Sequence, residues 1–404
     1  MPVAESTRPI ASRPRAPGAG PRILIGITHS QTCLTLTGRL RALSLAGFDV
    51  TLVSSPGPLL DRTASREGVT AIALPIERRI APLRDLVSFL RLLALIRRLR
   101  PAVAEFSTPK AGLLGTLAAA VACVPVRIYM LRGFKLDTAS GLRRRLLIAC
   151  ERLAARSAHV VLCNSDSLRN QAIALRIAPA RKLHLIGRGS SNGVNVERFS
   201  PGRSNLREQL AIPPGAPVLG FVGRLTRDKG LPELITAFDI LSSARPDAHL
   251  LLVGWYDAAE DALDSTLRAG IESNPRIRST GFVDNTAPWY RAMDVFILPT
   301  FREGFPNVVL EASATGIPVI TTDSTGARDS ILPGVTGLLI PPGQPEAIAA
   351  AALTLLADPD LRLRMGHAGR AWVAGHFADT HVLGLAVDFY KALLAGSGSP
   401  KNPA

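Results

Sequence analysis

Short apolar runs, each long enough for a buried strand, recur along this chain and alternate with longer segments in which apolar residues follow a helical spacing. The run at residues 216–222 is typical of a strand buried on both faces of a parallel sheet. Regular alternation of strand and helix predicts a doubly wound α/β fold. The strands expected lie at residues 22–28, 49–54, 69–74, 102–106, 126–131, 159–163 and 182–186, and then at 218–222, 248–253, 277–280, 295–298, 319–321 and 337–340.

The length of the chain predicts two domains, because 404 residues exceed what one ordinary hydrophobic core organises. A polar, turn-rich stretch around Pro201 separates the two series of strands. We therefore expect a first domain at residues 21–195, a second at 205–378 and a last helix at 379–395. Residues 1–20 have no apolar core and are expected to be a disordered tail.

The segment Arg302–Ala312 places two carboxylates, Glu303 and Glu311, on either side of a Gly-Phe-Pro loop. An apolar run precedes it and a helix is expected after Pro306, so Glu303 should lie at the carboxyl edge of a sheet, where open α/β sheets bind ligands. The start of that helix offers backbone N–H groups to an anion. A carboxylate beside an anion site favours a ligand with both phosphate and hydroxyl groups, such as a nucleotide sugar.

A second loop, residues 223–230 (G-R-L-T-R-D-K-G), fits the same ligand. A glycine at a strand end lets the backbone approach a phosphate. Arg224 offers a guanidinium fork and Lys229 a point charge. Either loop alone is equally typical of an ordinary solvated connection, but the two together favour phosphate binding.

These two loops resemble the retaining glycosyltransferases of family 4, which have the two-domain GT-B fold. Residues 281–284 (G-F-V-D) match the turn of that family that lies at the nucleotide base, and residues 322–329 match a later turn. In the first half, residues 107–115 and 189–195 resemble the subgroup that builds capsular, exopolysaccharide and O-antigen repeat units. The resemblance extends from about residue 21 to about residue 392.

The resemblance implies two Rossmann-like domains that face each other across a cleft, with the last helix crossing back to the first domain. It implies transfer from a nucleoside diphosphate sugar, with retention and without a metal or other cofactor. A uridine diphosphate N-acetylhexosamine or a deoxy relative is the favoured donor, and a polyprenyl-diphosphate-linked saccharide is the expected acceptor.

The resemblance also implies roles for individual residues. Glu303 binds hydroxyls of the donor sugar and Glu311 those of the ribose, while Arg224 and Lys229 offset the charge of the departing diphosphate. A double displacement with Glu303 as nucleophile remains an alternative. The other donor-binding residues implied are Gly223, Phe282, Gly304, Phe305, Pro306 and Asn307.

One departure from the family concerns the loop after the strand at residues 126–131, where many members carry a histidine. This chain has Arg132 in that loop, and an arginine cannot shuttle a proton at neutral pH. Ser107 likewise stands where the subgroup commonly has histidine. The residues expected on the acceptor or sugar side are Thr28, Ser30, Lys110, Arg132 and Lys135.

Charge is unevenly distributed: residues 1–200 carry a net +19 and residues 201–404 a net −4. The first half is therefore expected to meet an anionic partner. Two segments there, residues 84–100 and 143–152, combine arginines with apolar residues at helical spacing, which suits the headgroup layer of an anionic membrane. Ordinary crossover helices with a solvated basic face are the alternative. The membrane contacts expected are Arg84, Arg91, Arg97, Arg98, Arg143, Arg144 and Arg145.

Other classes of protein are less consistent with the sequence. The four cysteines have no metal-site spacing and are expected to be buried free thiols. The single Asp-x-Asp triplet, Asp358–Asp360, is better explained by helix capping than by a metal. A nucleic-acid-binding protein would fit the net charge of +15, but the basic half lacks interleaved aromatic residues.

A hydrolysing epimerase of the same fold and a non-catalytic lipid-binding scaffold also remain open. We find no secretion signal or membrane span in the sequence. The expected location is the cytoplasm, with peripheral binding to the inner face of the cell membrane.

Overall fold

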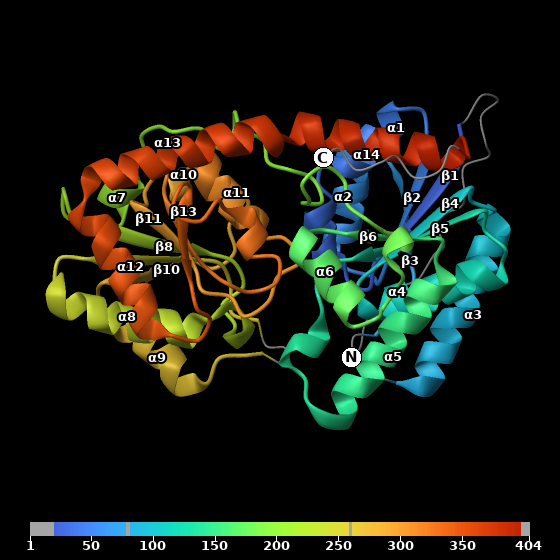
Figure 1. Cartoon of the computed structure of the whole chain (residues 1–404), viewed down its shortest axis with the longest axis horizontal. Helices are drawn as coiled ribbons and strands as arrows, with labels where there is room; N and C mark the ends of the chain where they lie inside the picture. Colours follow the sequence, from blue (N-terminus) through green and yellow to red (C-terminus); the bar gives the residue numbers. More distant parts are fainter. Residues whose placement is uncertain (1–19, 78–80, 258–260, 397–404) are drawn as a thin grey trace, which may run out of the picture. The chain divides into compact units, whose positions relative to one another are not determined.

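All of the expected strands are present in the structure, a computed structural model that describes residues 20–77, 81–257 and 261–396. The expected disordered tail lies outside the described residues, apart from Gly20. The chain divides into two compact units (Figure 1). The second unit contains Asn164–Gln171 and Gly187–Val382, and the first contains the rest. The domain limits given above stay a prediction.

The first unit is built on a parallel sheet of seven strands in the order β3-β2-β1-β4-β5-β6-β7. The strands are β1 (Arg22–Gly26), β2 (Asp49–Ser54), β3 (Thr70–Ala73), β4 (Val103–Ser107), β5 (Val126–Leu131), β6 (Val160–Cys163) and β7 (Leu183–His184). The helices are α1 (Arg39–Leu45), α2 (Pro58–Glu67), α3 (Pro82–Leu99), α4 (Pro109–Val121) and α5 (Gly141–Ser157). Helix α6 (Asp166–Ala174) belongs to the second unit up to Gln171 and to the first unit from Ala172 onward.

The second unit has a parallel sheet of six strands in the order β10-β9-β8-β11-β12-β13. The strands are β8 (Val218–Val222), β9 (His249–Val253), β10 (Ile277–Ser279), β11 (Val295–Leu298), β12 (Val319–Thr322) and β13 (Gly337–Ile340). The helices are α7 (Leu206–Gln209), α8 (Leu231–Ala244), α9 (Ser265–Ser273), α10 (Ala287–Tyr290), α11 (Asn307–Ala314), α12 (Pro345–Ala357) and α13 (Pro359–His376). The last helix, α14 (Asp379–Leu394), begins in the second unit.

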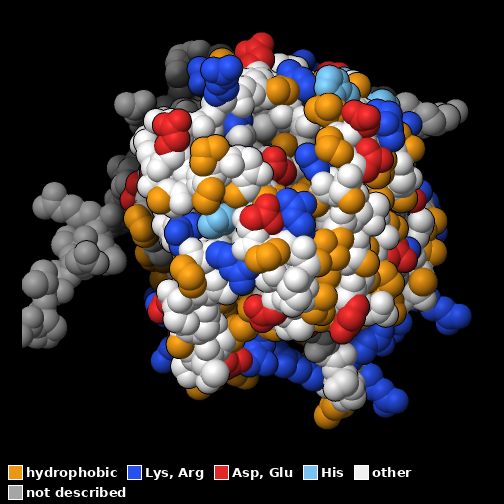
Figure 2. Space-filling model, turned by 90° about the vertical axis from the view of Figure 1, so that its left-hand side faces the viewer, with side chains coloured by type: hydrophobic (Ala, Val, Ile, Leu, Met, Phe, Trp, Pro, Cys, Tyr) orange, Lys and Arg blue, Asp and Glu red, His pale blue; other side chains and the backbone are white. Residues whose placement is uncertain are grey.

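Both sheets are buried on both faces, because helices cover each side. In the first unit, Ile23 and Ile25 of β1 face one apolar cluster and Leu24 faces another. In the second unit, the strands join one apolar cluster with helices α8, α11 and α12. On the face of the second unit that Figure 2 shows, acidic and basic side chains are scattered among each other. The predicted α/β class with two Rossmann-like sheets is confirmed.

Differences from the sequence predictions are small. The edge strand β7 has two residues, where five were expected, and it pairs with β6 alone. Helix α3 begins at Pro82 rather than near Leu86, since proline is favoured in a first turn. The prediction that the cysteines are buried is wrong for Cys123, which is exposed, and Cys150 is only partly buried. Asp358 caps α13, as expected, and its Oδ1 accepts from Leu361 N at 2.8 Å.

The last helix joins the first unit through a buried polar group. From Leu383 onward α14 belongs to the first unit. Nη2 of Arg39 lies 2.7 Å from the Glu105 carboxylate and 2.9 Å from the Tyr390 hydroxyl, which also contacts Glu105. The side chains of Arg39 and Glu105 are fully buried. The network therefore ties α1, β4 and α14 together.

We expect Arg39→Ala to destabilise the first unit by about 3–5 kcal/mol, because it leaves the Glu105 carboxylate buried without its cation. The measurement is the midpoint of thermal unfolding, which should fall by several degrees. Arg41→Ala, at an exposed position on the same helix, is the control and should leave the midpoint unchanged. Equal midpoints for the two variants would contradict a structural role for the ion pair.

Candidate functional site

The strand order of the second sheet reverses between β8 and β11, and ligands of doubly wound sheets bind beside such a reversal. The loops that follow these two strands are in direct contact there. Phe301 N donates to Asp228 O at 3.1 Å. Gly230, with φ of +74°, lies so close to Pro299 that a β-carbon would sit 2.1 Å from the proline carbonyl oxygen. Only glycine permits both this backbone conformation and this approach.

An ion pair joins the same two loops. Lys229 Nζ lies 2.5 Å from Glu303 Oε1, and the two side chains are 15% and 18% exposed. The backbone of Glu303 is fixed by a hydrogen bond, in which its N–H donates to Thr325 O at 3.1 Å. A cation and a carboxylate thus stand together at the carboxyl edge of the sheet, partly accessible to solvent. The pair can contact an anionic group and a hydroxyl-bearing group at the same time.

Arg224 follows β8 and is oriented by two carboxylates. Its Nη1 lies 3.0 Å from Asp257 and its Nη2 lies 3.4 Å from Asp228, and its side chain is still 32% exposed. Asp228 also accepts from Thr226 Oγ1 at 2.6 Å and from Arg302 at 3.3 Å. Burial raises the pKa of Asp228, but Lys229, Thr226 and the arginines outweigh it and hold the pKa below its ordinary value. The basic groups are therefore fixed by an ionised aspartate.

The predicted Gly-Phe-Pro loop leads directly into α11. Gly304, Phe305 and Pro306 are buried, and the Phe305 ring packs against Phe377 with centroids 5.3 Å apart. Asn307, the first residue of the helix, accepts at its Oδ1 from Ser190 Oγ at 2.9 Å. Packing on one side and this hydrogen bond on the other fix the start of the helix, whose first N–H groups have no partner within the helix.

Glu311 lies one turn further along α11 and is only partly exposed. Its Oε2 accepts from the Tyr290 hydroxyl at 2.9 Å, and the Thr286 hydroxyl lies 3.5 Å away. Burial raises the pKa of Glu311 to about 7, although the hydrogen bond from Tyr290 acts in the opposite direction. Sequence reasoning missed Tyr290, since nothing in the spacing of the two residues connects them.

The turn expected at a nucleotide base presents Phe282, whose side chain is 48% exposed. The Trp255 ring packs edge-on against it with centroids 5.4 Å apart. Trp255 follows β9, and its neighbour Gly254 forms a β-bridge with Gly281. An exposed phenylalanine ring, supported by a partly buried tryptophan ring, can receive a flat, apolar group. Trp255 was also missed, because it belongs to no motif.

Ser167 adds a polar contact to the second unit that sequence reasoning did not find. Its hydroxyl and backbone N–H both contact the Asp329 carboxylate, and Gly326 N donates to the same hydroxyl at 2.8 Å. Gly326 has φ of +76° and lies against the carbonyl oxygen atoms of Glu303 and Gly304. Ser167 therefore supports the loop that carries Glu303.

The first sheet has its own reversal of strand order, between β1 and β4. There Thr28 and Thr108, which follow these strands, place their hydroxyl oxygens 2.6 Å apart. Ala111 N at the start of α4 donates to Thr28 Oγ1 at 3.1 Å. Ser30 is buried, and Lys110 pairs with Asp85 at 2.7 Å. Thr28 and Lys110 thus follow the two strands at the reversal, and Lys110 is engaged by Asp85. Their role on the acceptor or sugar side stays a prediction.

Arg132 follows β5 in the first unit and is partly buried near Arg39 and Glu105. Burial lowers its pKa to about 10, and repulsion from Arg39 adds to this, against the attraction of Glu105 and Tyr390. At neutral pH the side chain is still a cation, which agrees with a charge-binding rather than a proton-transferring residue. Lys135 is exposed and begins a short 3-10 turn.

The arginines expected to contact a membrane lie on α3 and α5. Arg84, Arg91, Arg97 and Arg98 are exposed, as are Arg143 and Arg145, whereas Arg144 is partly buried. Apolar side chains accompany them on the surface: Leu83, Leu86, Val87 and Leu90 on α3, and Leu142, Leu146 and Leu153 on α5. Both helices pack against α4 (Figure 1). Within the described residues, no helix combines the length and the apolar character that crossing a membrane requires.

The described residues were also compared with the side-chain groups that hold metal ions in proteins. In those residues, no group of three or more His, Cys, Asp or Glu side chains has a metal-binding arrangement. Arg224 and Lys229 supply positive charge at the site.

Comparison with known proteins identifies the family. Residues 35–189 match the family described as "Glycosyl transferase 4-like domain", and residues 216–358 match "Glycosyl transferases group 1". The chain is 35% identical over 353 residues to the capsular polysaccharide biosynthesis glycosyltransferase CapM of Staphylococcus aureus, which covers 87% of this chain and 92% of that protein. It is 27% identical over 331 residues to the UDP-Gal:alpha-D-GlcNAc-diphosphoundecaprenol alpha-1,3-galactosyltransferase of Escherichia coli, covering 78% of this chain and 84% of that one.

Solved structures with low sequence identity share the fold. HepE of Anabaena, in complex with UDP and glucose, aligns with a TM-score of 0.75 and 19% identity over 92% of this chain and all of that one. Sucrose-phosphate synthase of Thermosynechococcus elongatus aligns with a TM-score of 0.77 and 21% identity over 93% of this chain and all of that one. These two likenesses concern the GT-B architecture alone. The 35% identity across nearly the whole of both chains, together with the two family matches, shows that this chain belongs to the group 1 glycosyltransferases, the retaining enzymes of family 4.

Proposed function

We propose that this chain transfers a sugar from a uridine diphosphate sugar, with retention, onto a polyprenyl-diphosphate-linked saccharide during synthesis of a cell-surface polysaccharide. The observation that carries the proposal is the Lys229–Glu303 pair at the reversal of strand order in the second sheet. The names of two relatives support the substrates, since one acts in capsular polysaccharide synthesis and the other uses UDP-Gal and a diphosphoundecaprenol acceptor. An N-acetylhexosamine or a deoxy relative is the favoured sugar.

The donor diphosphate is bound by charge in this proposal. Lys229 and Arg224 contact its oxygens, with the backbone at Gly223 close by and the N–H groups around Asn307 facing the same anion. These groups stabilise the negative charge that develops as the diphosphate departs, and because Asp228 and Asp257 already orient the arginine, little reorganisation is needed.

The sugar and the nucleoside are bound by the two glutamates and the aromatic pair. Glu303 accepts hydrogen bonds from hydroxyls of the donor sugar, and Glu311 accepts from those of the ribose. Phe282, supported edge-on by Trp255, offers a surface for the base. Gly304, Phe305 and Pro306 shape the turn that holds Glu303 beside the start of α11.

The reaction breaks the bond between the anomeric carbon and the phosphate oxygen, and the carbon forms a new bond to an acceptor hydroxyl. The hydroxyl attacks from the side of the leaving group, so the anomeric configuration is retained, and its proton passes to the departing diphosphate. Arg132, Thr28, Ser30 and Lys135 border the acceptor or the sugar in this proposal. In this proposal the acceptor attacks directly, and Glu303 binds sugar hydroxyls without forming a covalent intermediate.

The acceptor is reached at an anionic membrane surface, which the enzyme contacts through α3 and α5. Leu86 and Leu90 on α3, and Leu142 and Leu146 on α5, are exposed apolar residues beside arginines. Such a face inserts into the headgroup layer, where each basic side chain contributes about 1 kcal/mol. This contact is peripheral and reversible, and it places the enzyme at the cytoplasmic leaflet.

A panel of nucleotide sugars tests the function directly. Uridine sugars should raise the thermal midpoint of the purified chain more than guanosine or adenosine sugars do. Turnover of the preferred donor should then depend on a lipid-linked saccharide. Preferential stabilisation by a guanosine sugar would contradict the uridine assignment, and rapid turnover without any acceptor would point to a hydrolysing epimerase.

Glu303→Gln and Lys229→Ala should each lower kcat by about 100-fold or more, because both side chains act on charge that develops in the transition state. Steady-state kinetics with the true acceptor measures this. Arg227→Ala is a matched control, since this arginine belongs to the same loop but pairs with Asp264 at the surface. Near-normal turnover by Glu303→Gln would show that the site is assigned wrongly.

Nucleotide affinity should depend on the protonation of Glu311. Its pKa of about 7 means that the carboxylate, which accepts the ribose hydroxyls, is lost as the pH falls through 7. Affinity of the wild type for UDP should therefore weaken between pH 8 and pH 6, by up to about ten-fold per pH unit below the pKa. Glu311→Gln is the control, because its pH profile reports only the titration of the nucleotide itself. At pH 8 this variant should bind UDP more weakly than the wild type does. Parallel pH profiles for the two proteins would contradict a role for the Glu311 carboxylate.

Membrane binding should be electrostatic and should depend on α5. The wild type is expected to sediment with anionic vesicles at low salt and to be released at high salt. Replacing Arg143, Arg144 and Arg145 with Glu should reduce vesicle binding and activity on lipid-linked acceptor together. If the variant and the wild type were equally active on membranes, the basic half would serve another partner.

A further inference from the structure

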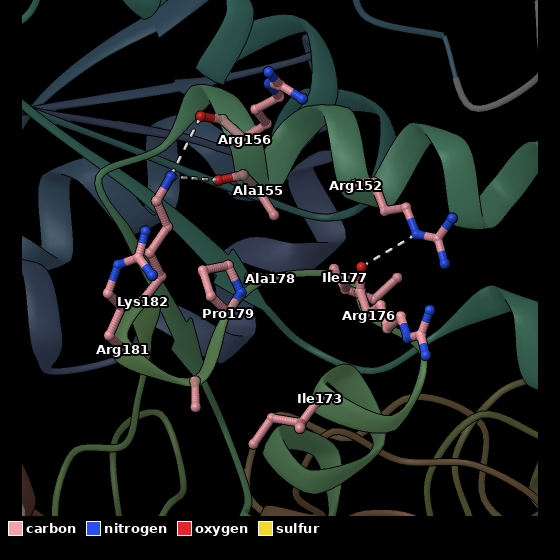
Figure 3. Close-up of a pocket in the computed structure, with 11 residues that line it drawn as sticks. Arg152, Ala155, Arg156, Ile173, Arg176, Ile177, Ala178, Pro179, Arg181 and Lys182 are labelled. Atoms are coloured by element: carbon pink, nitrogen blue, oxygen red, sulfur yellow. Dashed lines mark hydrogen bonds between the residues drawn. The ribbon is translucent and has the colours of Figure 1, made fainter.

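A hollow of about 540 Å³ in the first unit lies away from the reversal of strand order in that unit's own sheet. The ends of α5 and α6 and the segment leading into β7 form its wall (Figure 3). It therefore opens at the amino edge of β6 and β7, whereas Thr28 and Thr108 lie at the carboxyl edge of the same sheet. Figure 3 shows Arg156, Arg181 and Lys182 toward one end and Arg152 and Arg176 toward the other.

Two of the five basic residues have a structural role. Arg152 donates from Nη2 to Leu175 O at 2.9 Å and from Nε to Arg176 O at 3.1 Å, which are carbonyls just past the end of α6. Lys182 Nζ donates to Ala158 O at 2.8 Å, just past the end of α5. Both therefore satisfy carbonyl groups that a helix end leaves without partners. Helix capping explains their presence fully.

The other three arginines have no such role. Arg156, Arg176 and Arg181 are exposed, and the structure gives their guanidinium groups no ion pair or hydrogen bond with any described residue. Among the residues that the structure describes, no acidic side chain lines the hollow. Burial lowers the pKa of Lys182, and repulsion from Arg127, Arg181 and Arg156 lowers it further. A site of uncompensated positive charge attracts anions, and a bound anion relieves the repulsion.

The remaining lining of the hollow narrows the choice of anion. Its apolar part consists of aliphatic residues such as Ile173, Ile177 and Pro179, and none of the described residues that line it is aromatic. A nucleotide would find no ring to stack on and no carboxylate for its ribose. Along α5, the exposed side chain of Leu153 follows Arg152 directly, and Leu142 and Leu146 lie on earlier turns. Arginines next to exposed aliphatic side chains fit a phosphate group that lies beside a hydrocarbon surface.

We propose that this hollow binds the phosphate of an anionic phospholipid headgroup, held by Arg156, Arg176 and Arg181 while α5 lies at the membrane surface. The proposal rests on the membrane contact proposed above and deepens it, because it turns a general attraction to negative charge into a discrete headgroup site. It is separate from donor binding, and so its failure would leave the transfer reaction standing.

The experiment compares the full-length chain with Arg156→Ala/Arg181→Ala in sedimentation with phosphatidylcholine vesicles that contain or lack phosphatidylglycerol. Neither arginine caps a helix, so the variant should fold, and unchanged stabilisation by the preferred nucleotide sugar verifies this. Arg41→Ala/Arg62→Ala is the control, since it removes the same charge from exposed positions on α1 and α2. The hollow variant should bind phosphatidylglycerol vesicles roughly thirty-fold more weakly than the control does, and neutral vesicles equally.

Three results would overturn the proposal. An equal loss in both variants would mean that only net charge matters. Stabilisation of the wild type, but not of the hollow variant, by inorganic diphosphate, with vesicle binding unchanged, would assign the hollow to a soluble anion. Binding of a single-stranded oligonucleotide that survives about 0.2 M salt and is lost in the hollow variant alone would assign it to nucleic acid.

Discussion

The contact between loops at a reversal of strand order is the constraint on which the rest of this structure depends. A parallel sheet leaves its polar loops at one edge, and only where the order reverses do two loops from adjacent strands diverge enough to admit a ligand. In the second unit, Lys229 and Glu303 meet at that point. In the first, Thr28 and Thr108 occupy the equivalent position. The polar chemistry of each unit follows from this placement.

The residues behind these contacts hold them rigid. Asp228 and Asp257 orient Arg224, Tyr290 fixes the Glu311 carboxylate, and Ser167 braces the loop of Glu303 through Gly326. Charge in the second unit is compensated locally. The first unit instead keeps surplus positive charge on α3 and α5 and in the hollow between α5 and β7. The paired and preorganised charges of the second unit suit a site where charge develops during a reaction. The surplus positive charge of the first unit suits a surface that meets an anionic partner.

Apolar patterning was sufficient to predict the fold. Strands β8, β11 and β13 begin and end where the sequence indicates, because each is a short apolar run between turn residues. The two loop motifs predicted that Glu303 and Lys229 lie at a sheet edge. The sequence could not predict the 2.5 Å contact between these two residues or the partners of Arg224. Asp257 is 33 positions from Arg224, and no periodicity relates residues at that distance. The raised pKa of Glu311 depends on burial around Tyr290, which appears only once the chain is folded.

The central claim is that Lys229 binds the diphosphate and Glu303 the sugar of one donor. Calorimetry with UDP and with the preferred nucleotide sugar, on the wild type, Lys229→Ala and Glu303→Gln, tests this division most directly. Lys229→Ala should weaken both ligands, since both carry the diphosphate, whereas Glu303→Gln should weaken the nucleotide sugar and leave UDP unchanged. Equal weakening of both ligands by Glu303→Gln, or no change in either variant, would contradict the account.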